Sequence, residues 1–330
     1  MTLLSIPVID LAETFSSDVR DCLAAAHDVL AASRAIGMFY VTNHGVPTPL
    51  IDAHFALARS FFALELGEKR AIDVSRSNCF RGYEAFGSQT IDAATPGDLK
   101  EGFIMGPDLA PDHPHVLARY PNTGTNLWPQ RPAGFRSHME AYVDAMNRLG
   151  RRLAGLLARS LELPADYFAA PLSDPLTYSQ LLYYPSLPAE GRTNRLGAGA
   201  HVDWGMLTIL LQDDVGGLEV YAGETAWLAA PPVPDSFVII LGEMILRLTD
   251  GFYRSAQHRV KKNTSGRGRY AMPTFFDPEY DYRVACTPTC KPARGEPRYP
   301  ARTVAQHMQE MARETLSAAA TPKHIREAQQ

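Results

Sequence analysis

The sequence predicts an α+β protein: a double-stranded β-helix (jelly-roll) core with helices of the N-terminal half packed around it. Two observations support this fold class. Residues 1–170 carry helical periodicity interrupted by loops, whereas residues 171–290 consist of short β-rich runs separated by Gly, Pro and Asp. With 330 residues, 45% of them hydrophobic, the chain can also bury a sizeable core. Residues 291–330 add a last helix and a polar tail.

The N-terminal region begins with alternating strand and helix signals. Residues 5–11 predict a short strand, and residues 18–36 predict a helix whose apolar positions share one face and whose end is marked by Gly37. Residues 39–45 are β-like and end in a turn. A second helix begins at Thr48-Pro49, because proline is tolerated at the first helical position. These elements are expected to frame the β core.

A long amphipathic helix is predicted over roughly 134–163, where apolar residues recur at helical spacing. The preceding segment, residues 75–130, is rich in Gly, Pro, Asn and Asp and predicts loops and short strands. Residues 301–317 carry the last helical pattern.

Between residues 176 and 286 the pattern alone allows a barrel or a jelly roll. Its β-rich runs are LTYSQLLYYP, MLTILLQ, LEVYA, FVIILG, YRSAQHRV, RYAMPTFF and YRVAC.

Composition sets limits on partners and location. The net charge of −4 and the short basic clusters give no reason to expect nucleic acid or a membrane as partner. The four cysteines form no CxxC pair, so reduced thiols in a cytoplasmic protein are expected. The N-terminus lacks a basic signal-peptide region, and no run reaches the length of a membrane span. A small-molecule partner is therefore expected, while the oligomeric state is not encoded in any pattern.

The main chemical signal is His201-Val202-Asp203. In a strand, residues i and i+2 project from the same face, so both side chains can reach one ion. His258 follows after enough chain for several strands to return beside the first. Two histidines and one carboxylate form the facial triad of non-haem Fe(II) oxygenases, which leaves open positions for a bidentate co-substrate and O₂. Zinc, in contrast, prefers closed tetrahedral sites or hydrolytic chemistry.

Arg269 is the second signal, because it follows His258 within the β-rich region. A guanidinium inside a barrel is costly unless it meets an anion. A dicarboxylate co-substrate that chelates the metal through its 2-oxo acid end would place its far carboxylate there. Arginine suits this task through bidentate, charge-assisted hydrogen bonds.

At this point the ordered motifs resemble a known family, the isopenicillin N synthase-like branch of the 2-oxoglutarate/Fe(II) dioxygenases. The resemblance covers nearly the whole chain, with a weaker match after about residue 290. The matching segments are IPVIDL, GMFYVTNHGV, FRGY, DLKEGF, AHVDWGMLTILLQDDVGGLEV, GEMILRLTDGFYRSAQHRV and RYAMPTFFDP. The resemblance implies an Fe(II) enzyme that uses 2-oxoglutarate and O₂. It would hydroxylate, desaturate or cyclise a small organic substrate and release succinate and CO₂.

Carried over residue by residue, the resemblance makes His201, Asp203 and His258 the iron ligands. It pairs Arg269 with the distal carboxylate of 2-oxoglutarate, and Tyr184 supports the same co-substrate. No catalytic residue is implied beyond the metal centre. Four further residues are candidates for the substrate pocket or its entrance: Phe275, from the family pattern, and Arg81, Tyr83 and Trp204, from their places in the chain.

Two departures from the family pattern keep alternatives open. Position 271 is alanine where the family has serine, and Leu182 stands where the family has asparagine. The serine hydroxyl that would bind the distal carboxylate is thus missing. One alternative is an oxidase of the same fold that needs no 2-oxoglutarate, or one that turns it into ethylene and succinate. The other is a non-catalytic small-molecule-binding protein. The family pattern makes His44 structural, as a cap of the TNHGV turn. The other histidines outside the triad lack ligand-like spacing and are expected to be solvated or locally bonded.

Overall fold

Two sheets form the core of the computed structural model, which describes residues 5–15, 21–90, 97–188, 195–222 and 227–320. The larger sheet has the strand order β1-β2-β10-β7-β12-β5-β4-β3, and the smaller has the order β6-β11-β8-β9. Only β1 and β2 pair in parallel within these two sheets of the described chain. The strands are β1 (Val8–Asp10), β2 (Met38–Thr42), β3 (Gly82–Glu84), β4 (Glu101–Met105), β5 (Leu176–Tyr184), β6 (Ala198–His201), β7 (Leu207–Gln212), β8 (Leu218–Tyr221), β9 (Trp227–Ala229), β10 (Phe237–Leu241), β11 (His258–Val260) and β12 (Arg269–Asp277), with β13 (Arg283–Val284) and β14 (Arg302–Thr303) as a separate pair.

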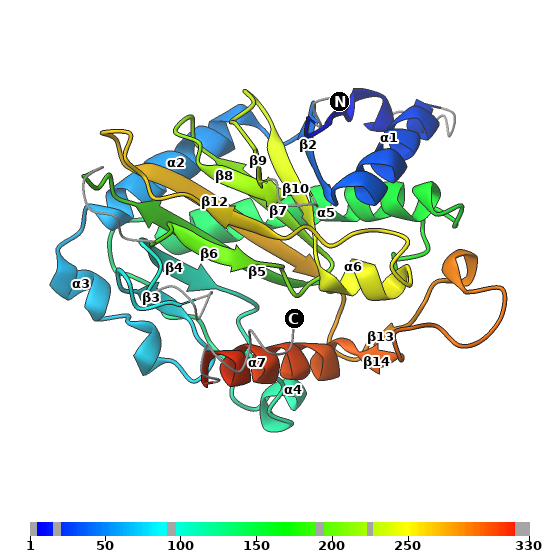
Figure 1. Cartoon of the computed structure of the whole chain (residues 1–330). Helices are drawn as coiled ribbons and strands as arrows, with labels where there is room; N and C mark the ends of the chain where they lie inside the picture. The colour runs from blue at the N-terminus through cyan, green and yellow to red at the C-terminus, as the bar shows by residue number, and fades with distance from the viewer. Residues whose placement is uncertain (1–4, 16–20, 91–96, 189–194, 223–226, 321–330) are drawn as a thin grey trace.

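Helices cover the outer face of the larger sheet, and the longest of them, α5, runs behind it (Figure 1). The long helix predicted over roughly 134–163 is confirmed as α5, and the predicted N-terminal helices are confirmed as α1 and α2. None of the described helices is both long and apolar enough to cross a membrane. The helices are α1 (Asp21–Ala35), α2 (Thr48–Phe62), α3 (Leu66–Arg70), α4 (Pro114–Leu117), α5 (Phe135–Ser160), α6 (Glu243–Leu248) and α7 (Val304–Ala320), with short 3₁₀ turns at Ala12–Phe15, Val74–Arg76 and Pro288–Cys290.

The two faces of the larger sheet have different neighbours, because successive side chains of a strand alternate between faces. On β5 and β12, Leu181 and Phe276 point outward into the hydrophobic cluster that α5 completes. Gly150 of α5 sits directly against the Phe276 ring, since a Cβ there would lie 2.6 Å from the ring. Leu182 and Ala271 point inward, where they pack with residues of the smaller sheet. The jelly-roll interior is therefore the space between the two sheets.

The N-terminal region contributes more than a helical frame. Its strands β1 to β4 occupy both ends of the larger sheet, with β2 beside β10 and β4 beside β5. The inner faces of β4 and β5 consequently line the same interior as the C-terminal strands. This arrangement brings residues from both halves of the chain to the metal centre described below.

Candidate metal centre

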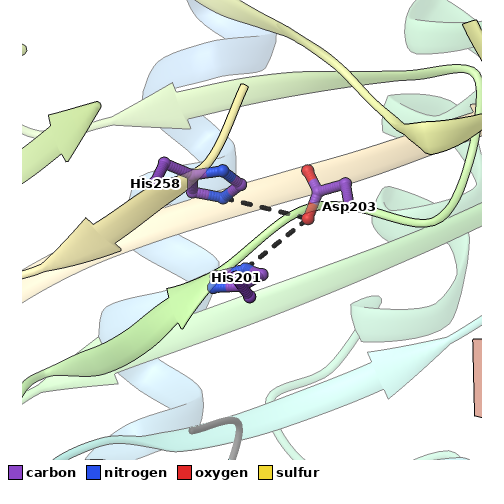
Figure 2. Close-up of side chains that lie close together, drawn as sticks. All are labelled: His201, Asp203 and His258. Atoms are coloured by element: carbon purple, nitrogen blue, oxygen red, sulfur yellow. Dashed lines mark ion pairs between the residues drawn. The ribbon is translucent and has the colours of Figure 1, made fainter. Parts of the chain in front are cut away.

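The three predicted ligands converge at one end of the interior. His201 ends β6, Asp203 lies in the loop just after it, and His258 begins β11, directly opposite His201 in the pairing register. One ligand atom from each residue lies within 4.8 Å of the other two. Figure 2 shows both imidazoles directed at the Asp203 carboxylate, whose Oδ1 is 3.5 Å from His201 Nε2 and 3.8 Å from His258 Nε2. The expectation that Asp203 continues the strand is not met, but the convergence is.

Backbone carbonyls fix both imidazole rings. His201 Nδ1 lies 2.8 Å from the Gly199 carbonyl oxygen, and His258 Nδ1 lies 2.9 Å from that of Ala256. A carbonyl only accepts, so each Nδ1 carries a proton, and in the neutral tautomer of such a ring the lone pair is on Nε2. Metal-binding histidines are held by the same kind of outer hydrogen bond. Both lone pairs are thus presented toward Asp203.

The Asp203 carboxylate is held by the surrounding chain. Thr208 Oγ1 donates a 2.5 Å hydrogen bond to Oδ2, and the first amide of α6, from Glu243, donates to the Asp203 carbonyl at 2.8 Å. Burial by itself would raise the pKa of Asp203, but the His258 and His201 imidazoles and the Thr208 hydroxyl lower it well below its usual range. The carboxylate is therefore ionised at neutral pH and ready to bind a cation.

We call residues 202–206 the metal loop, and three further contacts hold it in place. The Met244 amide donates to the Gly205 carbonyl at 3.1 Å. The Met206 amide donates to Asp277 Oδ1 at 2.5 Å. The buried His307 of α7 forms a hydrogen bond through Nε2, which lies 2.7 Å from the Trp204 carbonyl oxygen. The loop is thus fastened to α6, β12 and α7 at once.

His258 is neutral under ordinary conditions. Its burial, followed by the nearby His201, lowers the pKa of His258 to about 4, although Asp203 acts in the opposite direction. The neutral imidazole is the form that binds metal. The donor set of two imidazole nitrogens and one carboxylate oxygen fits Fe(II), because three protein ligands leave half of an octahedral shell for other molecules.

Arg269 lies on the inner face at the far end of β12 and is 1% exposed. Its guanidinium carbon stands 4.7 Å from the centre of the Tyr184 ring, and Tyr184 is its direct cross-strand partner. Nη2 reaches only the Gln212 side-chain oxygen, at 3.4 Å, while Nε and Nη1 have no partner among the described residues. A buried cation with spare donors needs an anion, so the geometry fits a carboxylate group.

Family models match both halves of the chain. The model described as the non-haem dioxygenase N-terminal domain in morphine synthesis matches residues 6–131, and that of the 2OG-Fe(II) oxygenase superfamily matches residues 177–278. A 2-oxoglutarate-Fe(II) type oxidoreductase, hxnY, from Emericella nidulans is 35% identical over 309 residues, which cover 90% of this chain and 86% of the relative.

The chain belongs to the 2-oxoglutarate/Fe(II) oxygenase superfamily.

Solved structures of this superfamily have the same fold. A 2OG-Fe(II) oxygenase family protein from Caulobacter crescentus has a TM-score of 0.82 and 30% identity, over 94% of this chain and 99% of the other. A full-length Neurospora crassa protein, solved in complex with alpha-KG and thymine, has a TM-score of 0.83 at 24% identity, over 94% and 97% of the two chains. This oxygenase is an Fe(II)- and 2-oxoglutarate-dependent enzyme that oxidises a small organic substrate with O₂, and the isopenicillin N synthase-like branch fits the match.

The four residues expected to line the oxygenase's pocket occupy different places. Phe275 and its cross-strand partner Tyr178 lie on the inner face of the larger sheet. Arg81 stacks on Tyr178, 4.7 Å from the ring centre, and two of its nitrogens donate to backbone carbonyls. Tyr83 is not brought to the interior, because it lies in the outer cluster and its hydroxyl donates to Glu101 at 2.5 Å. Trp204 follows Asp203 in the metal loop and is half-buried.

Sequence reasoning missed three residues that shape the site: Thr208, Gln212 and His307. Gln212 is found only when the strand register is known, since its partner lies on β12. Thr208 bonds Asp203 only five residues earlier, but no periodicity indicates that side-chain contact across the metal loop. His307 was expected to be solvated or locally bonded, which is wrong, because it is buried and its partner is far away in the chain. The same expectation is wrong for His54, which is fully buried and stacked on Tyr142.

Proposed function

We propose that His201, Asp203 and His258 hold the Fe(II) of this oxygenase, and that Arg269 with Tyr184 binds the distal carboxylate of 2-oxoglutarate. The observation that carries this assignment is that the interior holds two groups that each lack a ligand. A metal-type donor set stands at one end, and a buried guanidinium with two unpaired nitrogens among the described residues stands at the other. A 2-oxo dicarboxylate satisfies both.

Bound Fe(II) supplies the redox chemistry that activates O₂ and couples it to loss of CO₂ from the 2-oxo acid. The chain's own residues do the rest. Gly199 and Ala256 carbonyls keep the two imidazoles in their metal-binding tautomer, and Thr208 keeps the carboxylate oriented. The apolar inner residues exclude water from the reacting groups, which limits side reactions. They include Leu210, Val238, Ile240 and Val220.

The primary substrate is proposed to bind where the inner faces of β4, β5 and β12 meet near the metal. Phe275 would supply an apolar wall, and Arg81 would hold Tyr178 in place from behind. Trp204 stands at the edge of the metal loop and is kept as a candidate for the rim. The working compartment is proposed to be the cytoplasm, because the four cysteines are unpaired.

The experiment measures co-substrate binding and turnover. Mn(II)-loaded protein is titrated with 2-oxoglutarate by calorimetry, and Fe(II)-loaded protein is assayed for succinate formation and O₂ uptake. Arg269→Met is expected to weaken 2-oxoglutarate binding by a factor on the order of 100, because a charge-assisted pair is lost. Arg267→Met is the matched control, since Arg267 is exposed and pairs with Asp214 at the surface. O₂ uptake that does not require 2-oxoglutarate would instead support the oxidase alternative.

A further inference from the structure

Three buried N–H-bearing nitrogens at the Arg269 end of the interior have no acceptor among the described residues. Two belong to Arg269, Nε and Nη1, and the third is Nε2 of Gln212. Buried polar groups in folded proteins almost always find a partner. A cluster in which all three unpaired atoms are donors therefore indicates a site for an acceptor, and two of the three are already assigned to a carboxylate.

The strand register places the third donor beside the other two. Gln212, the last residue of β7, is the direct cross-strand partner of Ala271 on β12. Directly paired residues project from the same face with their Cβ atoms in contact range. Arg269 is two residues before Ala271, so it projects from that face as well. The alanine methyl leaves room over which the longer Gln212 side chain can extend.

The orientation of the Gln212 amide follows from its neighbour. A guanidinium carries only donors, so the amide must turn its oxygen toward it. The structure has this arrangement, with Oε1 3.4 Å from Arg269 Nη2. Nε2, with its two N–H groups, is consequently directed away from the guanidinium and remains available to an acceptor bound beside it.

We propose that Gln212 is a co-substrate-binding residue: its Nε2 donates a hydrogen bond to the distal carboxylate of 2-oxoglutarate. Gln212 thereby replaces the serine hydroxyl that this chain lacks at position 271. The inference rests on the proposed function, because it needs the distal carboxylate to lie at Arg269. It also explains how the chain keeps a full set of donors despite carrying alanine.

A rival explanation is that Gln212 only orients Arg269 through Oε1 and never touches the co-substrate. Two substitutions at position 212 and one at position 271 separate the explanations. Gln212→Glu keeps an acceptor for Arg269 but loses the N–H donors and brings a negative charge to the carboxylate, so it should bind 2-oxoglutarate worse than Gln212→Met, which loses both functions at nearly the same size. If Gln212 donates to the co-substrate, Ala271→Ser must improve binding by a larger factor in Gln212→Met than in the wild type, because the hydroxyl replaces a lost donor. If Gln212 only orients Arg269, Ala271→Ser must improve binding by the same factor in both.

The measurement is the Kd of 2-oxoglutarate for Mn(II)-loaded protein, obtained by calorimetry without turnover. Gln212→Met is expected to raise this Kd about tenfold, and Gln212→Glu to raise it by a further factor of about 10. The Kd of 2-oxopentanoate, which lacks the distal carboxylate, is expected to stay unchanged in both variants. Adding Ala271→Ser to Gln212→Met is expected to restore most of the affinity, since the hydroxyl reoccupies the donor position.

Three further results would overturn the inference: no change in the 2-oxoglutarate Kd, unimpaired binding by Gln212→Glu, or equal losses for 2-oxoglutarate and 2-oxopentanoate. Mn(II) affinity, measured on each variant, verifies that the metal centre is intact. Failure of the proposed function looks different, because Arg269→Met would then leave 2-oxoglutarate binding unaffected. If Arg269→Met weakens binding and the Gln212 variants do not, only the role of Gln212 is refuted.

Discussion

Thr208→Val tests how much of the metal affinity depends on the hydrogen bond behind the carboxylate ligand. Valine keeps the shape of threonine, so the substitution removes one hydroxyl and opens no cavity. The lost bond joins Thr208 Oγ1 to Asp203 Oδ2 at 2.5 Å in a buried setting. A hydrogen bond to a charged group contributes about 1.5–3 kcal/mol. At about 1.4 kcal/mol for each factor of 10, the metal Kd should rise roughly tenfold to hundredfold.

The assay is Mn(II) binding followed through the electron paramagnetic resonance signal of the free ion. Thr274→Val is the matched control, because Thr274 is equally buried on the same sheet but bonds Ser179, 3.1 Å away and remote from the ligands. Both variants are expected to lose stability in urea, and only Thr208→Val should lose metal affinity. Equal Mn(II) affinity in the two variants would refute the assigned role of Thr208.

Three further predictions concern the buried histidines and the metal loop. Burial lowers the pKa of both His258 and His307 to about 4 in the folded protein. Between pH 6.5 and 4 these imidazoles therefore bind protons in the unfolded chain but stay neutral in the folded one. The free energy of unfolding in urea should therefore fall by a few kcal/mol between pH 6.5 and 4, and a flat or rising profile would contradict this. His307→Leu should cost about 1–3 kcal/mol in the same assay, because it leaves the metal-loop carbonyl unpaired, and the pH-dependent loss should shrink. Gly205→Ala should lower the melting temperature and weaken Mn(II) binding, because its Cβ would overlap the Asp277 carboxylate; Gly67→Ala, where the Cβ meets nothing within 4 Å, is the control and should do neither.

The sequence allowed the ligands to be predicted because their signal is chemical and nearly local. His201 and Asp203 are two residues apart, and the family-like motif around His258 completes the set. The convergence predicted for them is present in the structure. The strand-based reason was incomplete, because β6 ends at His201 and the metal loop, rather than the pleat, presents Asp203. The α6 amides that hold this loop come from a distant segment that no local pattern connects to it.

Residues that act across strands could not be found in this way. Whether Tyr83 faces the interior depends on its pairing with Phe103, and the register turns it outward. Gln212 pairs with Ala271 only because β7 and β12 meet at that offset. A shift of one residue would exchange the faces of a whole strand, and periodicity alone does not fix such a shift. The one local hint was that Gln212 is the polar residue ending an apolar run.

The alternation along β5 and β12 makes two properties of this enzyme separately adjustable. Tyr178, Gln180 and Leu182 share the inner face of β5, while their immediate neighbour Leu181 belongs to the scaffold behind it. A directed-evolution library confined to the inner positions could therefore remodel which molecule is oxidised without touching the support that α5 provides. Neighbouring codons would thus be under unrelated selective pressures. A conservation profile averaged over a window of sequence would miss this difference between inner-face and outer-face positions.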